Sequence, residues 1–399
     1  MEERILVFNA GSSSLKFCVY RRQDSETWHL DAKGQVDGAA LRLVVRDQAE
    51  APLVDEAVAG TSIETGGAFA AAADWLGDRC GRARVVGIGH RVVHGGARRA
   101  GPCLVTPEVI EELRALVPLA PLHQPLNLTT IEAAGKRFPG VAQVACFDTS
   151  FHRGRAPVAE LVPLPKSIRD GGVQRYGFHG LSCEYIASAL PDVAPEIAGG
   201  RVLVAHLGSG ASLCALENGK SVETTLGFTA LDGLCMGTRP GSLDPGVVLY
   251  LFRTLGLSAV EVEKMLYEQS GLLGISGISN DMRKLIGNPE PAARLAVDYF
   301  VYEAAKHVGA LAAVLGGVDA LVFTAGIGEH SAEIRRRLGH ACAWLGLELD
   351  DEANTRDARQ ARRISKPQSR VATWVIPTNE EMVIARRLAA LLAVRGRFA

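Results

Sequence analysis

Long apolar runs and an excess of charge of one sign are both missing from this sequence of 399 residues. The formal net charge is −1, so nothing in the composition favours nucleic acid or an anionic membrane as a partner. The most apolar stretch, Val308 to Phe323, is interrupted by Gly316, Gly317 and Asp319, which excludes a membrane-spanning helix. Acidic residues precede a very short apolar run at the start, a pattern that does not fit a secretory signal.

Paired cysteines are missing too. The eight cysteines are scattered, with no C-x-x-C pair and no zinc spacing, which is typical of free thiols in a reducing cytoplasm. His90 and His94 in GHRVVHGG are four residues apart, the spacing at which two histidines on a helix bind one metal ion. They lie on a predicted strand, where four residues span roughly 13 Å, too far for one ion. We therefore expect a cytoplasmic protein without a zinc site.

What the sequence does have is apolar content, 47%, which is ample for two domains at this length. Predicted helices, such as residues 68–79 and 107–121, alternate with predicted strands, such as 141–147 and 320–324. This alternation indicates an α/β class with partly parallel sheets, in which ligands gather at the carboxyl ends of strands. No low-complexity linker is visible, so we expect a compact hinge between the domains.

The opening hairpin occurs twice. ILVFNAGSSSLKFCVY, residues 5–20, reads as strand, Gly/Ser turn and strand, and VLVAHLGSGASLCALENGK, residues 202–220, repeats this order. A shift of 197 residues lays Asn9 on His206. The repeat predicts duplicated domains that each open with the same hairpin, and the second hairpin turns again at Asn218-Gly219.

Glycine turns after strands expose backbone N–H groups, and hydroxyls add further donors, so such turns suit phosphates. One turn alone is weak support, because many Gly/Ser turns have no ligand. A third motif, strand–Gly-x-Gly–helix, follows residues 320–324 and would hold the rest of a nucleotide. Arg239 lies in a Gly/Pro loop. A loop arginine is usually a solvated charge, but beside a phosphate-binding turn it would stabilise a transferring phosphoryl group. His179 precedes a predicted helix, where a purely structural role is as good an interpretation as a functional one.

The C-terminal helix predicts a metal ligand. Thr378 and Glu381 have the spacing of a capping box, which would occupy Glu381 and leave Glu380 to face a site. Glu380 and Asn9 would then share a magnesium ion, largely through water. Arg91 would bind a carboxylate with two parallel hydrogen bonds.

Together, FNAGSSSLKF, GHRVVHGG, PLAPLHQPLN, FDTSFH, YGFHG, HLGSGAS, GFTALDGLCMGTRPGSLDP, FTAGIGEHSAEIR and PTNEEMVIAR resemble the acetate/propionate kinase family over essentially the whole chain. The resemblance implies the duplicated actin-like ATPase (ribonuclease H-like) fold with its active site in the interdomain cleft. Residues 1–150 plus 376–399 would form the acyl-substrate and magnesium domain, and 151–375 the nucleotide-binding and dimerisation domain. It also implies a homodimer, Mg2+ or Mn2+ as cofactor, and phosphoryl transfer between ATP/ADP and acetate or another short-chain carboxylate.

The family's site residues carry over by position. The catalytic positions match Arg91, Asp148, His179 and Arg239, with Arg91 also binding the substrate carboxylate. The apolar pocket for the acyl methyl matches Val93, Leu122, Phe178 and Ala230, and the metal positions match Asn9 and Glu380. The nucleotide positions match Ser12, Ser14, Lys16, His206, Leu207, Gly208, Ser209, Gly210, Asp281, Met282, Arg283, Gly326, Ile327, Gly328, Glu329 and His330.

The chain departs from the family at Ser209 and His330, which replace asparagines, and at Ala230, which replaces proline. Pro240 and Ser242 also depart beside Arg239. A smaller residue at position 230 widens the acyl pocket, and one methylene discriminates by only about 1–3 kcal/mol. Propionate kinase is therefore an alternative function.

A carboxylate with its usual pKa is already ionised at neutral pH, so Asp148 is not needed as a general base. It is expected instead to orient magnesium-bound water or to position Arg91 or Arg239. In the segment that contains Asp281, a helix cap by Asn280 or Asp281 is a simpler alternative to nucleotide binding. Two other functions stay open: a dinucleotide-dependent oxidoreductase, suggested by FTAGIGEHS, and a non-catalytic ATP-binding module of the actin or chaperone kind.

Overall fold

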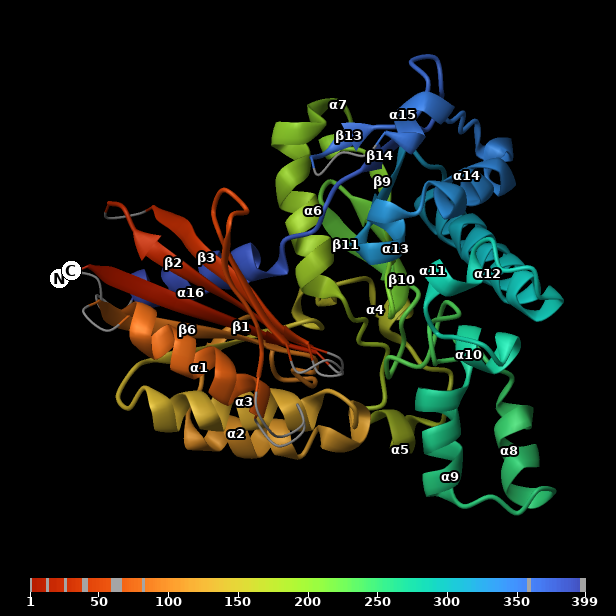
Figure 1. The fold of residues 1–399 in the computed structure, drawn as a ribbon. Helices are drawn as coiled ribbons and strands as arrows, with labels where there is room; N and C mark the ends of the chain where they lie inside the picture. Colours follow the sequence, from red (N-terminus) through yellow and green to blue (C-terminus); the bar gives the residue numbers. More distant parts are fainter. Residues whose placement is uncertain are drawn as a thin grey trace. The chain divides into compact units, whose positions relative to one another are not determined.

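The chain crosses twice between two units in the computed structural model, which describes residues 2–11, 14–24, 27–37, 42–58, 67–80, 83–356 and 360–394. The first unit comprises Met1–Phe151 and Asn379–Ala399, and the second comprises His152–Thr378. Figure 1 labels the elements of both units.

An eight-stranded sheet forms the first unit, in the order β5-β4-β3-β2-β1-β6-β8-β7. β1 and β2 form the opening antiparallel hairpin, whereas β1, β6 and β8 run parallel. The carboxyl ends of these three parallel strands therefore meet at one edge of the sheet. The strands are β1 Glu3–Ala10, β2 Ser14–Arg22, β3 Trp28–Asp37, β4 Arg42–Asp47, β5 Pro52–Ala57, β6 Arg84–Val92, β7 Cys103–Leu104 and β8 Gln143–Phe147.

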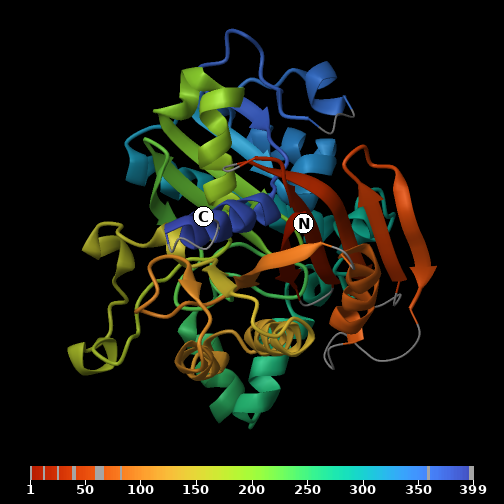
Figure 2. The same cartoon turned by 90° about the vertical axis from the view of Figure 1, so that its left-hand side faces the viewer.

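Helices cover both faces of this sheet (Figures 1 and 2). On one face, α1 and α3 pack over a core that includes Phe8 and Phe17. Helix α16 lies on the other face, and two glycines of β6 leave the space that it needs to pack closely. A Cβ on Gly87 would lie 2.5 Å from Leu392, and one on Gly89 would lie 2.5 Å from Ile384. The helical segments of this unit are α1 Gly67–Cys80, α2 Pro107–Arg114, η2 Val117–Leu119, α3 Gln124–Arg137 and α16 Glu380–Val394. A further segment, η3 Ser150–His152, begins in the first unit and ends at the first residue of the second.

A six-stranded sheet, ordered β11-β10-β9-β12-β14-β13, forms the second unit. α12 packs on one face and α6 on the other. The strands are β9 Arg201–Leu207, β10 Ala211–Glu217, β11 Lys220–Thr224, β12 Ala320–Thr324, β13 Arg362–Arg363 and β14 Ala372–Val375. The helical segments are α4 Pro157–Glu160, α5 Lys166–Arg169, α6 Gly180–Val193, α7 Pro195–Ala198, α8 Pro245–Arg253, α9 Ala259–Lys264, η4 Met265–Gln269, α10 Gly271–Ser276, α11 Met282–Leu285, α12 Pro291–Leu315, α13 Ala325–His330, α14 Ala332–Ala341, η5 Ala343–Leu345 and α15 Asp351–Thr355.

Both sheets have the same topology. Each begins with three antiparallel strands in sequence order, the first of which also pairs with a later, parallel strand. That later strand pairs in turn with a second parallel strand. Strands β1, β2, β3, β6 and β8 correspond in order to β9, β10, β11, β12 and β14. The predicted duplication is confirmed. The hairpin signal is confirmed as well, because Asn218 and Gly219 join β10 to β11 with φ values of 51° and 71°.

None of the helices in the described part of the chain is both long enough and apolar enough to cross a bilayer. Of the cysteines that the structure describes, none takes part in a disulfide.

A buried histidine makes the first unit sensitive to acid. His90, on β6, is 1% exposed, stacks on Phe8 and hydrogen-bonds the side-chain amide of Gln143 at 2.6 Å. Burial lowers the pKa of His90 to about 4, so the unfolded chain takes up a proton below about pH 6.5 that the folded chain does not. Its stabilising contribution is complete above pH 6.5 and falls by about 3 kcal/mol on acidification to pH 4.

We expect His90→Gln to unfold at urea concentrations that fall less steeply between pH 7 and pH 4.5 than those of the unsubstituted chain. Glutamine keeps a hydrogen-bonding group beside Gln143 but does not titrate. Equal pH slopes for the two proteins would contradict this assignment.

Candidate active site

Three polar side chains gather where the parallel strands of the first unit end. Asn9 lies near the end of β1, Arg91 near the end of β6, and Asp148 directly after β8. Nη1 of Arg91 donates to Oδ1 of Asn9 at 3.3 Å. These residues are brought together because neighbouring parallel strands end at the same edge of a sheet.

Arg91 and Asp148 form a buried ion pair. Nε of Arg91 contacts both carboxylate oxygens at 3.1 Å, and Nη2 contacts Oδ2 at 2.6 Å. The side chain of Asp148 is 1% exposed and that of Arg91 is 14% exposed. Burial opposes the charge of Arg91, but the carboxylates of Asp148 and Glu380 outweigh it and raise the pKa of the guanidinium. Arg91 is therefore held as a fixed cation at this edge.

Both glutamates at the start of α16 face Asn9. Nδ2 of Asn9 donates to Oε2 of Glu380 at 3.0 Å and to Oε1 of Glu381 at 2.8 Å. The predicted capping box is therefore wrong. Asn379 caps the helix by accepting a hydrogen bond from the backbone N–H of Met382 (3.0 Å), and Glu381 joins the site.

The ligand chemistry at this edge suits magnesium. Two carboxylates supply oxygen ligands, and magnesium keeps several of its waters instead of requiring an all-protein cage. The amide of Asn9 has an oxygen as well, which in this structure accepts from Arg91 while the amide nitrogen faces the carboxylates. Across the residues described, no group of three or more His, Cys, Asp or Glu side chains has the arrangement of a metal centre. Because carboxylate and amide oxygens are hard ligands, Asn9, Glu380 and Glu381 fit a partly hydrated magnesium ion better than a transition metal.

Two side chains of α3 hold the loop that follows β6, and sequence reasoning missed both. Oδ1 of Asn127 accepts from the N–H of Val93 (3.0 Å), and its Nδ2 donates to the carbonyl of Ala10 (3.0 Å). Gln124 bonds both the N–H and the carbonyl of His94 (3.2 and 3.1 Å). The sequence did contain a signal for this role, namely two amide side chains three residues apart at the start of a helix.

The first glycine turn is described in part. Ser12 lies outside the described residues, and the carbonyl of Ser14 accepts from the N–H of Gly11 at 2.9 Å. Lys16 stands opposite Asn9 in the β1–β2 register, so both side chains occur on one face of the sheet. Lys16 and Glu381 also line a cavity of about 590 Å3 in this unit.

In the second unit, two histidines meet at the second glycine turn. His206, near the end of β9, stacks on His179, with ring centroids 4.2 Å apart and planes inclined by 18°. His179 precedes α6 and adopts φ 56°, a left-handed conformation that is unusual for a residue with a side chain. Backbone strain of this kind is often found at functional sites.

Arg239 approaches the same turn. A Cβ added to Gly210 would lie 2.7 Å from Nη2 of Arg239 and 3.1 Å from Nε2 of His179. Arg239 is 9% exposed, and its Nη1 donates to the carbonyl of Ala230 at 2.8 Å. The N–H of Gly237, in the loop that carries Arg239, donates to the carbonyl of Ser209 at 3.0 Å. The turn, Arg239 and His179 thus lie together, and Arg239 gives this surface a cation.

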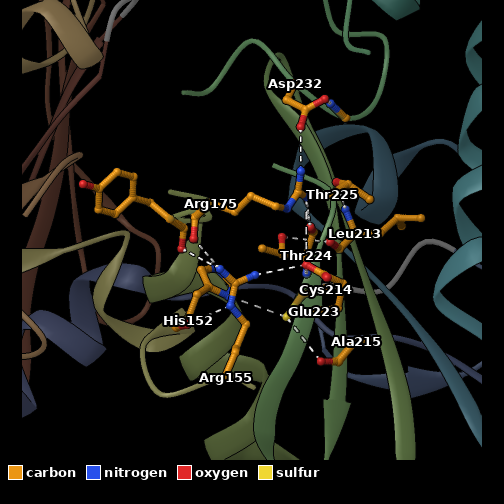
Figure 3. Close-up of polar contacts among 12 residues, drawn as sticks. His152, Arg155, Arg175, Leu213, Cys214, Ala215, Glu223, Thr224, Thr225 and Asp232 are labelled. Atoms are coloured by element: carbon orange, nitrogen blue, oxygen red, sulfur yellow. Dashed lines mark hydrogen bonds and ion pairs between the residues drawn. The ribbon is translucent and has the colours of Figure 1, made fainter. Parts of the chain in front are cut away.

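Figure 3 shows a network of two arginines, Arg155 and Arg175, in the second unit. The guanidinium of Arg155 is buried and donates to the carbonyls of His152 (2.9 Å) and Arg175 (2.7 Å) and to the carboxylate of Glu223 (3.1 Å). Nη1 of Arg175 donates to Oδ2 of Asp232 at 3.0 Å. Sequence reasoning missed this network, because its members are far apart in the chain.

The network contacts residues that neighbour His179 and Arg239, the two catalytic candidates of the second unit. Nε2 of His152 hydrogen-bonds the carbonyl of Phe178, directly before His179, at 2.9 Å. The hydroxyl of Ser242 donates to Oδ1 of Asp232 at 3.0 Å, which closes the loop that carries Arg239. Ser242 thus gains a structural explanation, whereas nothing in the structure explains Pro240.

The third glycine motif is built differently from its prediction. The helix α13 begins at Ala325, with φ 64°, so the predicted loop glycines, Gly326 and Gly328, lie inside the helix. The carboxylate of Glu329 accepts from the backbone N–H groups of Ala325 (2.7 Å) and Thr378 (3.1 Å). A carboxylate that binds two backbone donors stabilises the segment itself.

A buried arginine that sequence reasoning missed also supports α13. Arg335 is 2% exposed and donates to the carbonyls of Gly328 (2.9 Å) and Glu329 (2.8 Å) and to Oδ1 of Asn354 (2.8 Å). Burial, together with the charge of Arg362, lowers the pKa of Arg335 to about 10.

The remaining nucleotide candidates differ in accessibility. His330 has an exposed side chain, Met282 is buried, and Arg283 is exposed and pairs with Asp281. Asp281 caps α11 by accepting from the N–H of Arg283 at 2.9 Å, which confirms the cap as its role in the fold.

The four positions expected to seat an acyl methyl are divided between the units. Val93 and Leu122 belong to the first unit, and Phe178 and Ala230 to the second. Val93, Phe178 and Ala230 are buried, and Leu122 is partly buried.

Comparison with known proteins gives consistent results. The Acetokinase family model matches residues 4–386. An acetate kinase of Rhodopseudomonas palustris (strain TIE-1) is 51% identical over 393 residues, 97% of this chain and 98% of the relative. Among solved structures, a propionate kinase from Francisella tularensis subsp. tularensis SCHU S4 has a TM-score of 0.87 and 34% identity, covering 97% of this chain and 99% of its own. A Porphyromonas gingivalis acetate kinase has a TM-score of 0.82 and 34% identity, covering 98% of this chain and 100% of its own. These matches confirm the predicted duplicated actin-like ATPase fold.

Proposed function

Since this chain belongs to the acetokinase family, we propose that it is an acetate kinase, which reversibly transfers the terminal phosphoryl group of ATP to acetate and gives acetyl phosphate and ADP. The observation that carries the proposal is the fixed cation Arg91 beside Asn9, Glu380 and Glu381. It provides a site for an organic carboxylate next to oxygen ligands for magnesium. Propionate kinase, the alternative suggested by Ala230, is not favoured, because the relative at 51% identity is an acetate kinase.

The acceptor needs no general base. Acetate is ionised at neutral pH, so its oxygen is ready to attack phosphorus. Asp148 makes three contacts with Arg91, which supports a positioning role. Arg91 neutralises the acceptor, and Val93, Leu122, Phe178 and Ala230 would seat its methyl group and so align the attacking oxygen.

The second unit supplies donors for the phosphoryl group. Charge in the transition state spreads over the equatorial oxygens, where fixed cations and N–H groups stabilise it. Arg239 and His179 supply these groups beside Gly210. The nucleotide is assigned to Ser12, Ser14 and Lys16 of the first unit and to segments of the second, namely residues 206–210, 281–283 and 326–330.

Asn9, Glu380 and Glu381 would hold magnesium or manganese. When bound, the ion supplies positive charge to the phosphate oxygens. We expect Glu380→Gln and Glu381→Gln each to raise the magnesium concentration for half-maximal activity by about tenfold or more, because each loses a charged ligand. Magnesium titrations at saturating ATP would measure this. An unchanged midpoint for Glu381→Gln would restore the sequence-based assignment to Asn9 and Glu380.

A homodimer is also proposed. Helix α8 exposes Val247, Leu249, Tyr250 and Phe252, an apolar surface that a second copy would cover. Light scattering of the purified protein tests this, and Tyr250→Glu should shift the mass toward the monomer. We also propose a cytoplasmic location, because the cysteines that the structure describes are free thiols.

Trapping of acyl phosphate with hydroxylamine tests the proposed activity. Acetate is expected to give more acyl hydroxamate than propionate or butyrate at equal concentration. No product with any of the three acids would refute the proposal. Tight NAD binding without product would instead support the dinucleotide-dependent alternative, which the family assignment does not favour.

A single methyl group at the glycine turn should disturb catalysis. In Gly210→Ala, the new Cβ would lie 2.7 Å from Nη2 of Arg239, so the guanidinium must move. Because a shift of about 1 Å can cost 10²-fold, we expect kcat to fall about 10- to 100-fold with little change in stability. Gly101→Ala, which meets no atom within 4 Å, is the matched control. Equal kcat values for the two variants would show that Arg239 does not act at this turn.

A further inference from the structure

The stacked histidines present the same edge to the same turn. Nδ1 of His179 contacts the hydroxyl of Ser212, and Nδ1 of His206 contacts the hydroxyl of Ser182, both at 2.8 Å. In each ring, Nε2 is therefore the nitrogen that is directed away from the serine.

Both Nε2 atoms lie beside the second glycine turn. A Cβ on Gly210 would lie 3.1 Å from Nε2 of His179, and one on Gly208 would lie 3.9 Å from Nε2 of His206. The proposed function assigns phosphate binding to this turn. A protonated Nε2 donates a hydrogen bond to a phosphoryl oxygen, whereas a bare Nε2 presents a lone pair and repels it.

The serines decide which nitrogen carries the proton. Ser182 and Ser212 are 0% and 1% exposed, and each hydroxyl has one proton to donate. Among the residues that the structure describes, the histidine Nδ1 is the acceptor within reach of each hydroxyl. Buried donors are rarely left without an acceptor, so each hydroxyl donates to Nδ1. The ring proton of a neutral histidine is then on Nε2.

We propose that Ser212 and Ser182 are positioning residues that hold His179 and His206 as Nε2–H tautomers. Both rings then donate toward the phosphoryl oxygens at the Gly208–Gly210 turn. The identity of the ligand rests on the proposed function, but the tautomers are a property of the protein without substrate.

Nuclear magnetic resonance of the full-length protein, labelled with 15N in its histidine rings, tests the tautomers directly. His179→Gln and His206→Gln assign the signals. We expect both rings at neutral pH to show a protonated Nε2 and a hydrogen-bonded, unprotonated Nδ1. A neutral ring with its proton on Nδ1, at either position, would overturn the proposal. The unsubstituted protein gives this answer even if a serine variant does not fold.

Measurements of kcat and KM distinguish a positioning role of the two serines from a role in packing alone. Ser212→Ala and Ser182→Ala should each lower kcat about three- to tenfold, the effect of one neutral hydrogen bond, and leave the KM for acetate unchanged. Each should also move the Nδ1 resonance of its own histidine. Ser212→Thr and Ser182→Thr keep the hydroxyl and should restore both readouts.

Ser188→Ala is the matched control for α6, because Ser188 donates to the carbonyl of Tyr185 (2.8 Å) and should affect neither kcat nor the spectra. Unchanged kcat and Nδ1 resonances in both alanine variants would refute the proposal. If the unsubstituted chain makes no acetyl phosphate, the proposed function fails, whereas the spectra still decide the tautomers.

Discussion

Arg239→Ala is expected to lower kcat about 10³-fold while the KM for acetate changes less than about threefold. Arg239 is 9% exposed, and its Nη2 would lie 2.7 Å from a Cβ on Gly210, so the guanidinium is directed at the turn assigned to phosphate. A cation there interacts chiefly with charge that develops during transfer, so its loss raises the barrier more than it weakens acetate binding. Initial rates of hydroxamate formation measure both constants.

Three comparisons make this test specific. Arg239→Lys keeps the charge but loses the planar fork, so its kcat should lie between those of the unsubstituted enzyme and Arg239→Ala. Arg356→Ala removes an exposed arginine from the same unit and should leave kcat unchanged. Added guanidinium ion should restore part of the activity of Arg239→Ala. A kcat within tenfold of the unsubstituted value would exclude Arg239 from the transition state.

Arg91→Ala is expected to damage both acetate use and folding. The KM for acetate should rise by about 100-fold or more, because the cation that would neutralise the acetate is lost. Asp148, 1% exposed, would lose three hydrogen bonds and the neighbouring charge. Breaking a buried ion pair on one side costs about 3–5 kcal/mol, which urea unfolding would detect.

The double variant Arg91→Ala with Asp148→Asn separates the two effects. Removing both charges should recover part of the lost stability but none of the acetate affinity. Asp148→Asn alone should raise the KM for acetate, because Arg91 loses its positioning partner. A pH–rate profile that lost an acidic limb in Asp148→Asn would instead indicate a general base. Arg42→Ala breaks the exposed Arg42–Asp55 pair and should cause no measurable loss of stability. Equal losses for Arg42→Ala and Arg91→Ala would refute the electrostatic argument.

Several wrong or missing assignments have one cause. The capping box at Thr378 satisfies every local rule, yet the backbone N–H of Thr378 bonds Glu329, and Asn379 caps the helix. Asn9 then binds Glu381 across 372 positions of sequence. Local spacing predicts caps well, but it contains no information about a partner that another strand supplies.

The sequence by itself determined the duplicated α/β plan and the two hairpins. These features follow from hydrophobic periodicity and turn chemistry, which act between residues a few positions apart. Only the tertiary structure decided which side chains meet: Glu381 with Asn9, Asp148 with Arg91, and two serines with two histidines. Those pairings join residues from separate elements, and the packing of sheet and helix, not the order of the chain, sets their distances.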